Sequence, residues 1–131
     1  MKLLADTNVF IDFWNNLTDQ LTSVFEKEDI YICGIVRAEL LHGTVSKKNF
    51  NSVTKLLDVF DELNPEKGDW QKLGEQLYSL RRNGLSVPIS DVIIASIAIK
   101  NDISVWTRDH HFKLIQNVLT ELRLYEERWS K

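Results

Sequence analysis

Short apolar runs alternate along this chain with longer segments of helical periodicity. The runs at 3–5, 30–33 and 103–106 predict buried strands, with weaker strand patterns near Leu63 and at 122–125. Apolar residues spaced three and four apart predict helices at 7–17, 18–27, 35–42, 46–61, 65–83 and 90–100, with a short helix after 109. Strands separated by helices are joined by crossovers, so the pattern predicts an α/β fold with a central, mainly parallel sheet of four or five strands and helices on both faces.

Polar residues and glycines mark the expected helix ends. Thr18 and Ser46 are suitable N-caps, and Gly43 ends the helix that precedes it. Asn64 stands before a proline, which suits the first position of a helix, and Gly84 follows that helix at its far end.

The composition is that of a globular protein. The chain has 131 residues, 44% hydrophobic and 27% charged, which predicts one domain spanning 1–131. Its apolar runs are far shorter than the roughly 20 residues of a membrane helix, and the start resembles no signal peptide. We therefore expect a cytoplasmic protein with no membrane association. The single cysteine, Cys33, lies in an apolar run and is interpreted as a core residue.

The net charge of −3, from 16 Lys and Arg against 19 Asp and Glu, gives no global sign of nucleic-acid binding. A polyanion would have to be bound by local basic clusters. The candidates for phosphate contacts are Lys47, Lys48, Arg81, Arg82 and Arg108.

Three aspartates occupy similar positions relative to the predicted elements. Asp6 ends the first strand, Asp91 opens a helix that is apolar nearly all round, and Asp109 follows the strand that ends at Trp106. In open α/β sheets, ligands bind outside the carboxyl ends of the strands, so these carboxylates are offered to a ligand. Because aspartate is also a favoured helix N-cap, a purely structural role explains each of them equally well.

Glu39 cannot be explained as a cap, because it lies inside a predicted helix. Such a residue either faces solvent or points inward as an acid, and Ile35 and Gly43, one turn to either side, favour the inward orientation.

Convergence of the four acids would restrict the chemistry of the site. Two like charges about 4 Å apart repel by roughly 4 kcal/mol at an effective dielectric near 20, so a cluster requires protonation or a cation. Oxygen ligands select Mg²⁺ or Mn²⁺ and argue against zinc. Such an ion suits phosphodiester hydrolysis, in which Thr107 would hold a water or a phosphate oxygen.

Four segments together resemble the signatures of PIN-domain ribonucleases, and most closely the VapC toxins of type II toxin–antitoxin pairs. These are Asp6-Thr7-Asn8, Ala38-Glu39-Leu40-Leu41-His42-Gly43, Asp91-Val92-Ile93-Ile94-Ala95 and Thr107-Arg108-Asp109-His110-His111-Phe112. Their order and spacing and the chain length agree with that family.

The resemblance implies a Mg²⁺- or Mn²⁺-dependent endoribonuclease with a three-layer α/β/α fold. Asp6 and Asp91 would be the main metal ligands, Glu39 a third acid, and Asp109 a fourth that often acts through water, at a position where relatives often carry Asn. Thr107 and Asn8 would position substrate or water. The resemblance also implies a homodimer, a cognate antitoxin, and a structured RNA substrate such as tRNA or rRNA.

Two other functions compete with this one. A haloacid-dehalogenase-type phosphatase also begins with a strand ending in Asp, but it requires a second Asp where this chain has Asn8. A catalytically silent PIN-like module would bind RNA or protein only, and the intact set of acids argues against it. We assign no catalytic role to His42, His110 or His111, because the sequence gives none of them a partner.

Overall fold

Four parallel strands form the central sheet. The computed structural model describes residues 1–127. Its strands β1 (Lys2–Ala5), β2 (Asp29–Cys33), β3 (Asp61–Leu63) and β4 (Ser104–Trp106) lie in the order β3-β2-β1-β4. The predicted α/β class and parallel sheet are confirmed. The segment 122–125 adds no fifth strand, because Leu124 makes only an isolated parallel bridge to Val105.

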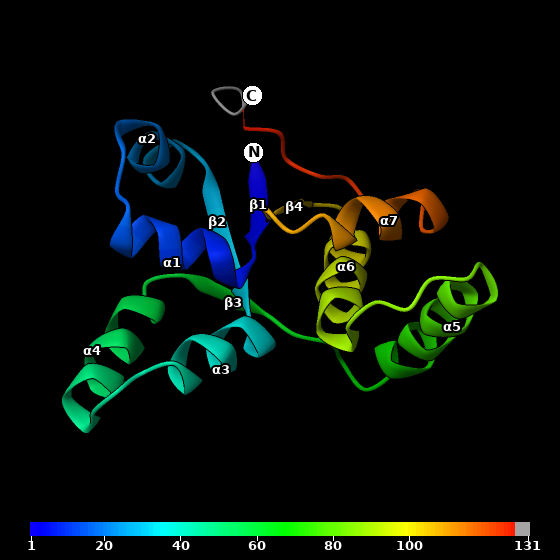
Figure 1. Cartoon of the computed structure of the whole chain (residues 1–131), viewed down its shortest axis with the longest axis horizontal. Helices are drawn as coiled ribbons and strands as arrows, with labels where there is room; N and C mark the ends of the chain where they lie inside the picture. The colour runs from blue at the N-terminus through cyan, green and yellow to red at the C-terminus, as the bar shows by residue number, and fades with distance from the viewer. Residues whose placement is uncertain (128–131) are drawn as a thin grey trace.

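Helices cover both faces of this sheet. They are α1 (Thr7–Asn15), α2 (Asp19–Lys27), α3 (Gly34–His42), α4 (Lys47–Leu57), α5 (Asp69–Arg82), α6 (Ile89–Asn101) and α7 (His111–Val118). Figure 1 shows α1 and α2 on one side of β1 and β2, and α5, α6 and α7 on the other, with α3 and α4 below. No helix in the described part of the chain is long and apolar enough to cross a membrane.

The central strand β1 brings two chain segments together at its carboxyl end. Leu3, Leu4 and Ala5 are fully buried, as expected for a parallel strand between two helical layers. Ala5 pairs with Trp106 of β4, and the next residue, Asp6, donates its backbone N–H to the Trp106 carbonyl at 2.9 Å. The residues that follow β1 and β4 therefore start side by side.

Helix α6 is the most enclosed of the described helices, as its apolar sequence predicts. Six of its side chains are buried, namely those of Asp91, Val92, Ile94, Ala95, Ile97 and Ala98. A helix that packs on several faces holds its first turn firmly, and Asp91 belongs to that turn.

Two predicted helix bounds are wrong. Helix α4 ends at Leu57, before the predicted end at 61, because Asp61 instead pairs with Tyr31 in the sheet. Helix α5 begins at Asp69 rather than after Asn64, because the Asn64 side chain accepts the Gly34 N–H at 2.7 Å. A Cβ at position 34 would lie 2.6 Å from that amide oxygen, so the close approach requires a glycine.

Candidate active site

Asp6 is buried at the end of β1 with both carboxylate oxygens hydrogen-bonded. Oδ1 accepts the backbone N–H of Thr7 at 2.7 Å and caps α1, while Oδ2 accepts the Thr107 hydroxyl at 2.8 Å. Burial raises the pKa of Asp6, these two hydrogen bonds oppose the rise, and the charges of Glu39 and Asp109 add to it. Asp6 therefore caps α1 and also stands at the carboxyl end of β1, while its role toward a ligand stays a prediction.

Thr107 links two of the predicted acids. Its hydroxyl donates to Asp6 and accepts the backbone N–H of Asp109 at 3.0 Å. Asp109 in turn accepts the His111 N–H at 2.9 Å, at the start of α7. The Thr107 hydroxyl is thus engaged by protein groups, and its structural effect is to orient Asp6 and the loop that carries Asp109.

Asp91 is held differently. The N-cap of α6 is Pro88 and Asp91 is the third helical residue, so its interpretation as a cap is wrong. Its carboxylate is buried, with the residue only 8% exposed, and Oδ2 has no hydrogen-bond partner among residues 1–127. Burial, followed by the charges of Asp109 and Asp6, raises the pKa of Asp91 to about 6, with His111 acting in the opposite direction.

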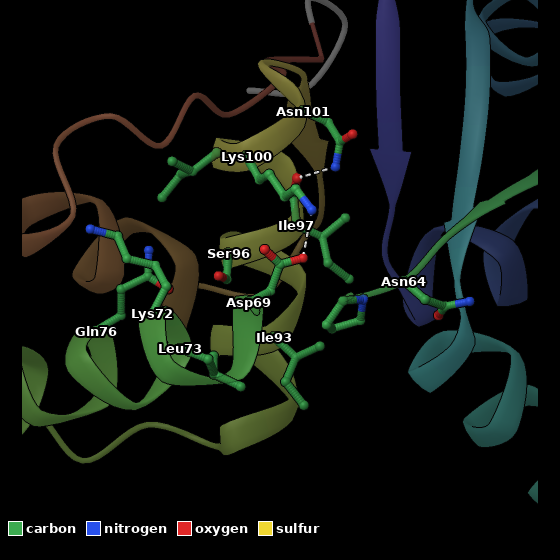
Figure 2. A pocket seen from close by; sticks show the side chains of 12 residues that line it. Asn64, Asp69, Lys72, Leu73, Gln76, Ile93, Ser96, Ile97, Lys100 and Asn101 are labelled. Carbon is green, nitrogen blue, oxygen red and sulfur yellow. Dashed lines mark hydrogen bonds and ion pairs between the residues drawn. The ribbon is translucent and has the colours of Figure 1, made fainter. Parts of the chain in front are cut away.

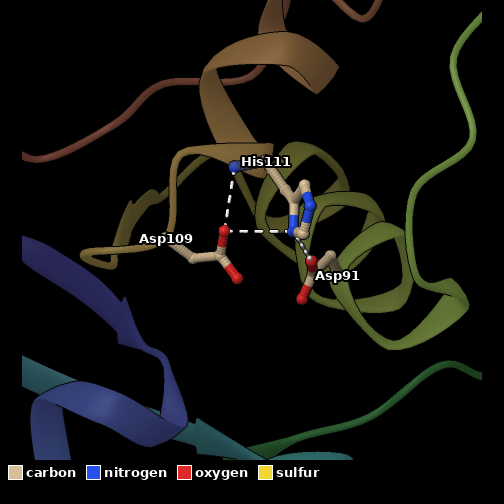
Figure 3. Close-up of side chains that lie close together, drawn as sticks. All are labelled: Asp91, Asp109 and His111. Carbon is tan, nitrogen blue, oxygen red and sulfur yellow. Dashed lines mark hydrogen bonds and ion pairs between the residues drawn. The ribbon is translucent and has the colours of Figure 1, made fainter.

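His111 lies between two of these acids, as Figure 3 shows. Its Nδ1 is 3.0 Å from Asp109 Oδ1 and 3.3 Å from Asp91 Oδ2. The expectation that no histidine has a partner is therefore wrong for His111. The available signal was its place two residues after Asp109, where a helix was expected to start. The His110 side chain is 80% exposed, with its Nδ1 3.7 Å from Asp109 Oδ1, and His42 is also exposed.

Glu39 reaches the same site from its rim. The residue is exposed on α3, so the expectation of an inward-facing acid is only half right. Its Oε1 accepts the hydroxyl of Thr7 at 2.9 Å, and its charge contributes to the raised pKa values of Asp6 and Asp91. Its carboxylate is therefore directed at the cluster while remaining open to water.

The residues at this edge of the sheet suit a divalent cation. Ligand atoms of Asp91, Asp109 and His111 lie within 4.8 Å of one another. Asp91 Oδ2 and His111 Nδ1 are buried atoms without a hydrogen bond in the described part of the chain, which is how ligand atoms appear when no ion is present. The donor set includes an imidazole nitrogen, so it is not limited to oxygen as expected.

The other predicted residues lie outside this cluster. Asn8 is exposed on the first turn of α1, and the basic candidates on α4 and α5, Lys47, Lys48, Arg81 and Arg82, are exposed as well. Arg108 forms ion pairs with Asp12 and Glu127, so its guanidinium is engaged by carboxylates.

A separate pocket of about 210 Å³ lies between α5 and α6, and none of the four acids lines it. Figure 2 shows the Lys100 ammonium directed at Asp69, and this pair is 2.7 Å apart. Glu66 also contacts Lys100, at 2.9 Å, so the Lys100 charge is neutralised by protein groups. The pocket lacks the uncompensated carboxylates found at the carboxyl end of β1.

Cys33 is a core residue, as predicted. Its side chain is fully buried, and burial raises the pKa of the thiol to about 11. A thiol with such a pKa is almost wholly protonated at neutral pH and is a poor nucleophile.

Comparisons with known proteins agree with this fold. A sequence model of the PIN domain matches residues 3–118. The chain resembles a chain of VapBC2 from Rickettsia felis, solved with promoter DNA (25% identity, TM-score 0.79, covering 95% of this chain and 98% of that one). It also resembles a chain of VapBC-1 from nontypeable Haemophilus influenzae, with 20% identity, a TM-score of 0.82 and coverage of 100% of both chains. A third match is VapBC-5 of Mycobacterium tuberculosis, a member of a toxin–antitoxin family, with 17% identity, a TM-score of 0.69 and coverage of 95% of this chain and 98% of that one. No curated protein sequence matches the chain.

Proposed function

Because the chain belongs to the PIN domain family, we propose that it is a divalent-metal-dependent endoribonuclease that acts as the toxin of a toxin–antitoxin pair. The observation that carries this proposal is the gathering of Asp6, Glu39, Asp91 and Asp109 where β1 and β4 end, with the raised pKa values of Asp6 and Asp91 traced partly to the charges of the other acids. Acids from four distant segments are drawn together at a cost in repulsion, which a bound cation offsets.

The proposed ligands of a Mg²⁺ or Mn²⁺ ion are Asp6, Asp91 and Asp109, with Glu39 as the acid that contacts the ion's water. When bound, such an ion lowers the pKa of an attacking water and stabilises the charge that develops on a phosphodiester. Glu39 is suited to accepting a proton from water because it is directed at the cluster and open to solvent.

The chain's own contribution is preorganisation. Thr107 and the Thr7 N–H hold the Asp6 carboxylate in one orientation, and the enclosed helix α6 fixes Asp91 opposite it. Carboxylates fixed before substrate binds lose little conformational freedom during the reaction. They therefore lower the activation free energy more than the same groups on mobile side chains would. We assign Thr107 as a positioning residue and leave Asn8 as a weaker candidate for orienting water or substrate.

The proposed substrate is a structured RNA, tRNA or rRNA. The site itself is acidic, so attraction of the RNA backbone falls to basic residues at a distance, and the candidates Lys47, Lys48, Arg81 and Arg82 are all exposed on the surface. We expect modest binding that weakens as salt rises, since each phosphate contact releases counterions.

The proposed partner is a cognate antitoxin, with the toxin itself a cytoplasmic homodimer. Support comes from the VapBC complexes that the chain resembles, above all the Rickettsia felis protein at 25% identity over nearly the whole of both chains. An antitoxin that covers the carboxylate edge would keep the nuclease inactive.

The function is tested by incubating purified protein with total tRNA in Mg²⁺, Mn²⁺ or EDTA. Cleavage is expected only with metal, and Asp6→Asn and Asp91→Asn should each lower its rate by about 100-fold or more, since each removes a ligand and a fixed charge. Asp19→Asn, which changes an exposed acid on α2, is the matched control and should cleave normally. Cleavage that persists in EDTA, or in both site variants, would remove the proposal.

A further inference from the structure

His111 has a buried imidazole nitrogen that makes no hydrogen bond within residues 1–127, although two carboxylates lie within ion-pair distance of it. Nδ1 lies 3.0 Å from Asp109 Oδ1 and 3.3 Å from Asp91 Oδ2, yet neither contact has the direction of a hydrogen bond. The opposing Asp91 oxygen is likewise buried without a hydrogen bond, in a residue 8% exposed. Two buried polar atoms within ion-pair distance of each other, but with no hydrogen bond to either in the described chain, suit a third species that both could bind.

The spacing of these atoms matches that of ligands on one ion. Adjacent ligands of an octahedral ion with bonds of about 2.1 Å are separated by about 3.0 Å. The separations from His111 Nδ1 to the two carboxylate oxygens are close to this value. All three groups also have a ligand atom within 4.8 Å of the others (Figure 3).

A purely neutralising role fits less well. A protonated imidazole that served only as a counter-ion would direct its Nδ1–H along a line to one carboxylate, because charge-assisted hydrogen bonds are short and strongly directional. His111 does not do this, although its backbone N–H does bind Asp109 at 2.9 Å. That backbone contact fixes where the ring begins and leaves the ring nitrogen turned to the space between the acids.

We propose that His111 Nδ1 is a direct ligand of the metal held by Asp91 and Asp109, and that it makes the site prefer Mn²⁺ to Mg²⁺. Mg²⁺ selects oxygen ligands, whereas imidazole nitrogen suits transition metals, among which Mn²⁺ also accepts carboxylates. The inference rests on the proposed function, since it concerns the same metal site. It adds a ligand and a metal preference that a set of acids alone does not give.

The direct test is electron spin-echo spectroscopy of the wild-type protein with one equivalent of Mn²⁺. A coordinated imidazole is expected to give modulation from a directly bound ¹⁴N, which should change when the protein carries ¹⁵N-histidine. Because this measurement uses the unaltered chain, it does not depend on a variant that might fail to fold. Mn²⁺ bound with no nitrogen modulation would overturn the inference.

Metal titrations of His111→Asn provide the second test, with Mn²⁺ followed by its free-ion spectrum and Mg²⁺ by competition. The amide offers oxygen in place of nitrogen, so Mn²⁺ affinity should fall about 10- to 100-fold while Mg²⁺ affinity changes less than about threefold. His42→Asn, at an exposed imidazole at the end of α3, should leave both affinities unchanged. Equal losses for the two metals in His111→Asn would contradict the proposed preference.

These outcomes are distinguishable from failure of the proposed function. A protein that binds Mn²⁺ through His111 but cleaves no RNA would retain the inference and lose the nuclease. A protein that cleaves RNA with metal but shows no nitrogen ligand would lose only the inference.

Discussion

Asp6 and Asp91 face the same site but are held in opposite ways. Asp6 has a hydrogen bond to each carboxylate oxygen, from Thr7 and from Thr107. Asp91 is buried to a similar degree, yet Oδ2 lacks a hydrogen bond in the described part of the chain and faces His111 instead. The half of the site around Asp6 has its polar atoms hydrogen-bonded by the protein. The half around Asp91 and His111 has buried polar atoms without a hydrogen bond among residues 1–127, which are open to an external ligand.

This difference in hydrogen bonding changes how the charge of each carboxylate is stabilised. Hydrogen bonds to a carboxylate stabilise its charge, and they oppose the pKa rise that burial imposes on Asp6. Asp91 has no such hydrogen bonds among the causes of its raised pKa, and it remains the acid whose charge most needs a cation. In the proposed metal site, the hydrogen-bonded half would be in place before an ion binds, whereas the half at α6 and α7 would be completed by the ion.

Apart from removal of the acids themselves, the largest expected effect comes from disturbing the hydrogen-bonded half. Thr107→Val keeps the shape of the side chain and removes the hydroxyl that binds Asp6 and the Asp109 N–H. Loss of a hydrogen bond to a buried charge costs about 1.5–3 kcal/mol, so RNA cleavage should slow by about 10- to 100-fold. The measurement is the single-turnover cleavage rate at saturating Mg²⁺ or Mn²⁺.

Thr107→Ser is the matched control, because it retains the hydroxyl and should cleave within a few-fold of the wild-type rate. If the valine variant cleaved as fast as the serine variant, Thr107 would have no positioning role and the comparison of the two halves would lose its basis.

A smaller effect is expected on stability without metal. Since burial raises the pKa of Asp91 to about 6, the ionised carboxylate disfavours the folded state at neutral pH. Asp91→Asn should therefore stabilise the metal-free protein at pH 7.5 by about 1–2 kcal/mol, after allowance for solvent screening, which is about 3–6 °C in Tm. Asp6→Asn should give less, because hydrogen bonds already stabilise the Asp6 charge.

The sign of the pH dependence follows from the raised pKa. The folded protein binds more protons at Asp91 than the unfolded chain does, so this group favours folding fully below its unfolded pKa and loses that benefit as pH rises through about 6. The advantage of Asp91→Asn should thus vanish near pH 4, as measured by thermal melts in EDTA from pH 4 to 8. An advantage that was constant over this range would show that the charge is not its cause.

The smallest effect is expected at Arg108, on the hydrogen-bonded side. Its guanidinium contacts Asp12 and Glu127, so Arg108→Ala should change RNA affinity by less than about twofold and lower stability by about 1 kcal/mol or less.

Lys47→Ala changes an exposed lysine and should instead reduce the slope of log affinity against log salt by about 1. Filter binding over a range of salt checks both variants. A reduced slope for Arg108→Ala would mean that the arginine leaves its ion pairs to bind phosphate.

Much of the fold could be predicted because the apolar pattern, the helix caps and the order of strands and helices all indicate the same structure. The central strand is apolar throughout, Thr18 and Ser46 cap the helices expected after them, and strands alternate with helices. The errors arose where a tertiary contact overrode a local signal. Asn64 has the character of a helix cap, but its amide binds Gly34 thirty residues away, and no local pattern contains that pairing.

The acids of the site were identifiable, but not the way in which each is held. Asp6, Asp91 and Asp109 all resemble caps in sequence. Only the three-dimensional structure shows that Pro88 takes the N-cap position of α6, so that Asp91 has no capping hydrogen bond to make among the described residues. Likewise, a pair of adjacent histidines gives no indication which ring turns inward. His111 does so because its backbone binds Asp109 as α7 starts.

The central claim is that acids from distant segments form one divalent cation site. The most direct measurement is a crystal structure of the protein with Mn²⁺, using the anomalous signal of the metal to locate it. A single strong peak is expected among Asp6, Asp91 and Asp109, within bonding distance of at least two of their carboxylates. A peak elsewhere, at the pocket between α5 and α6 for example, with this edge of the sheet empty at saturating Mn²⁺, would contradict the account.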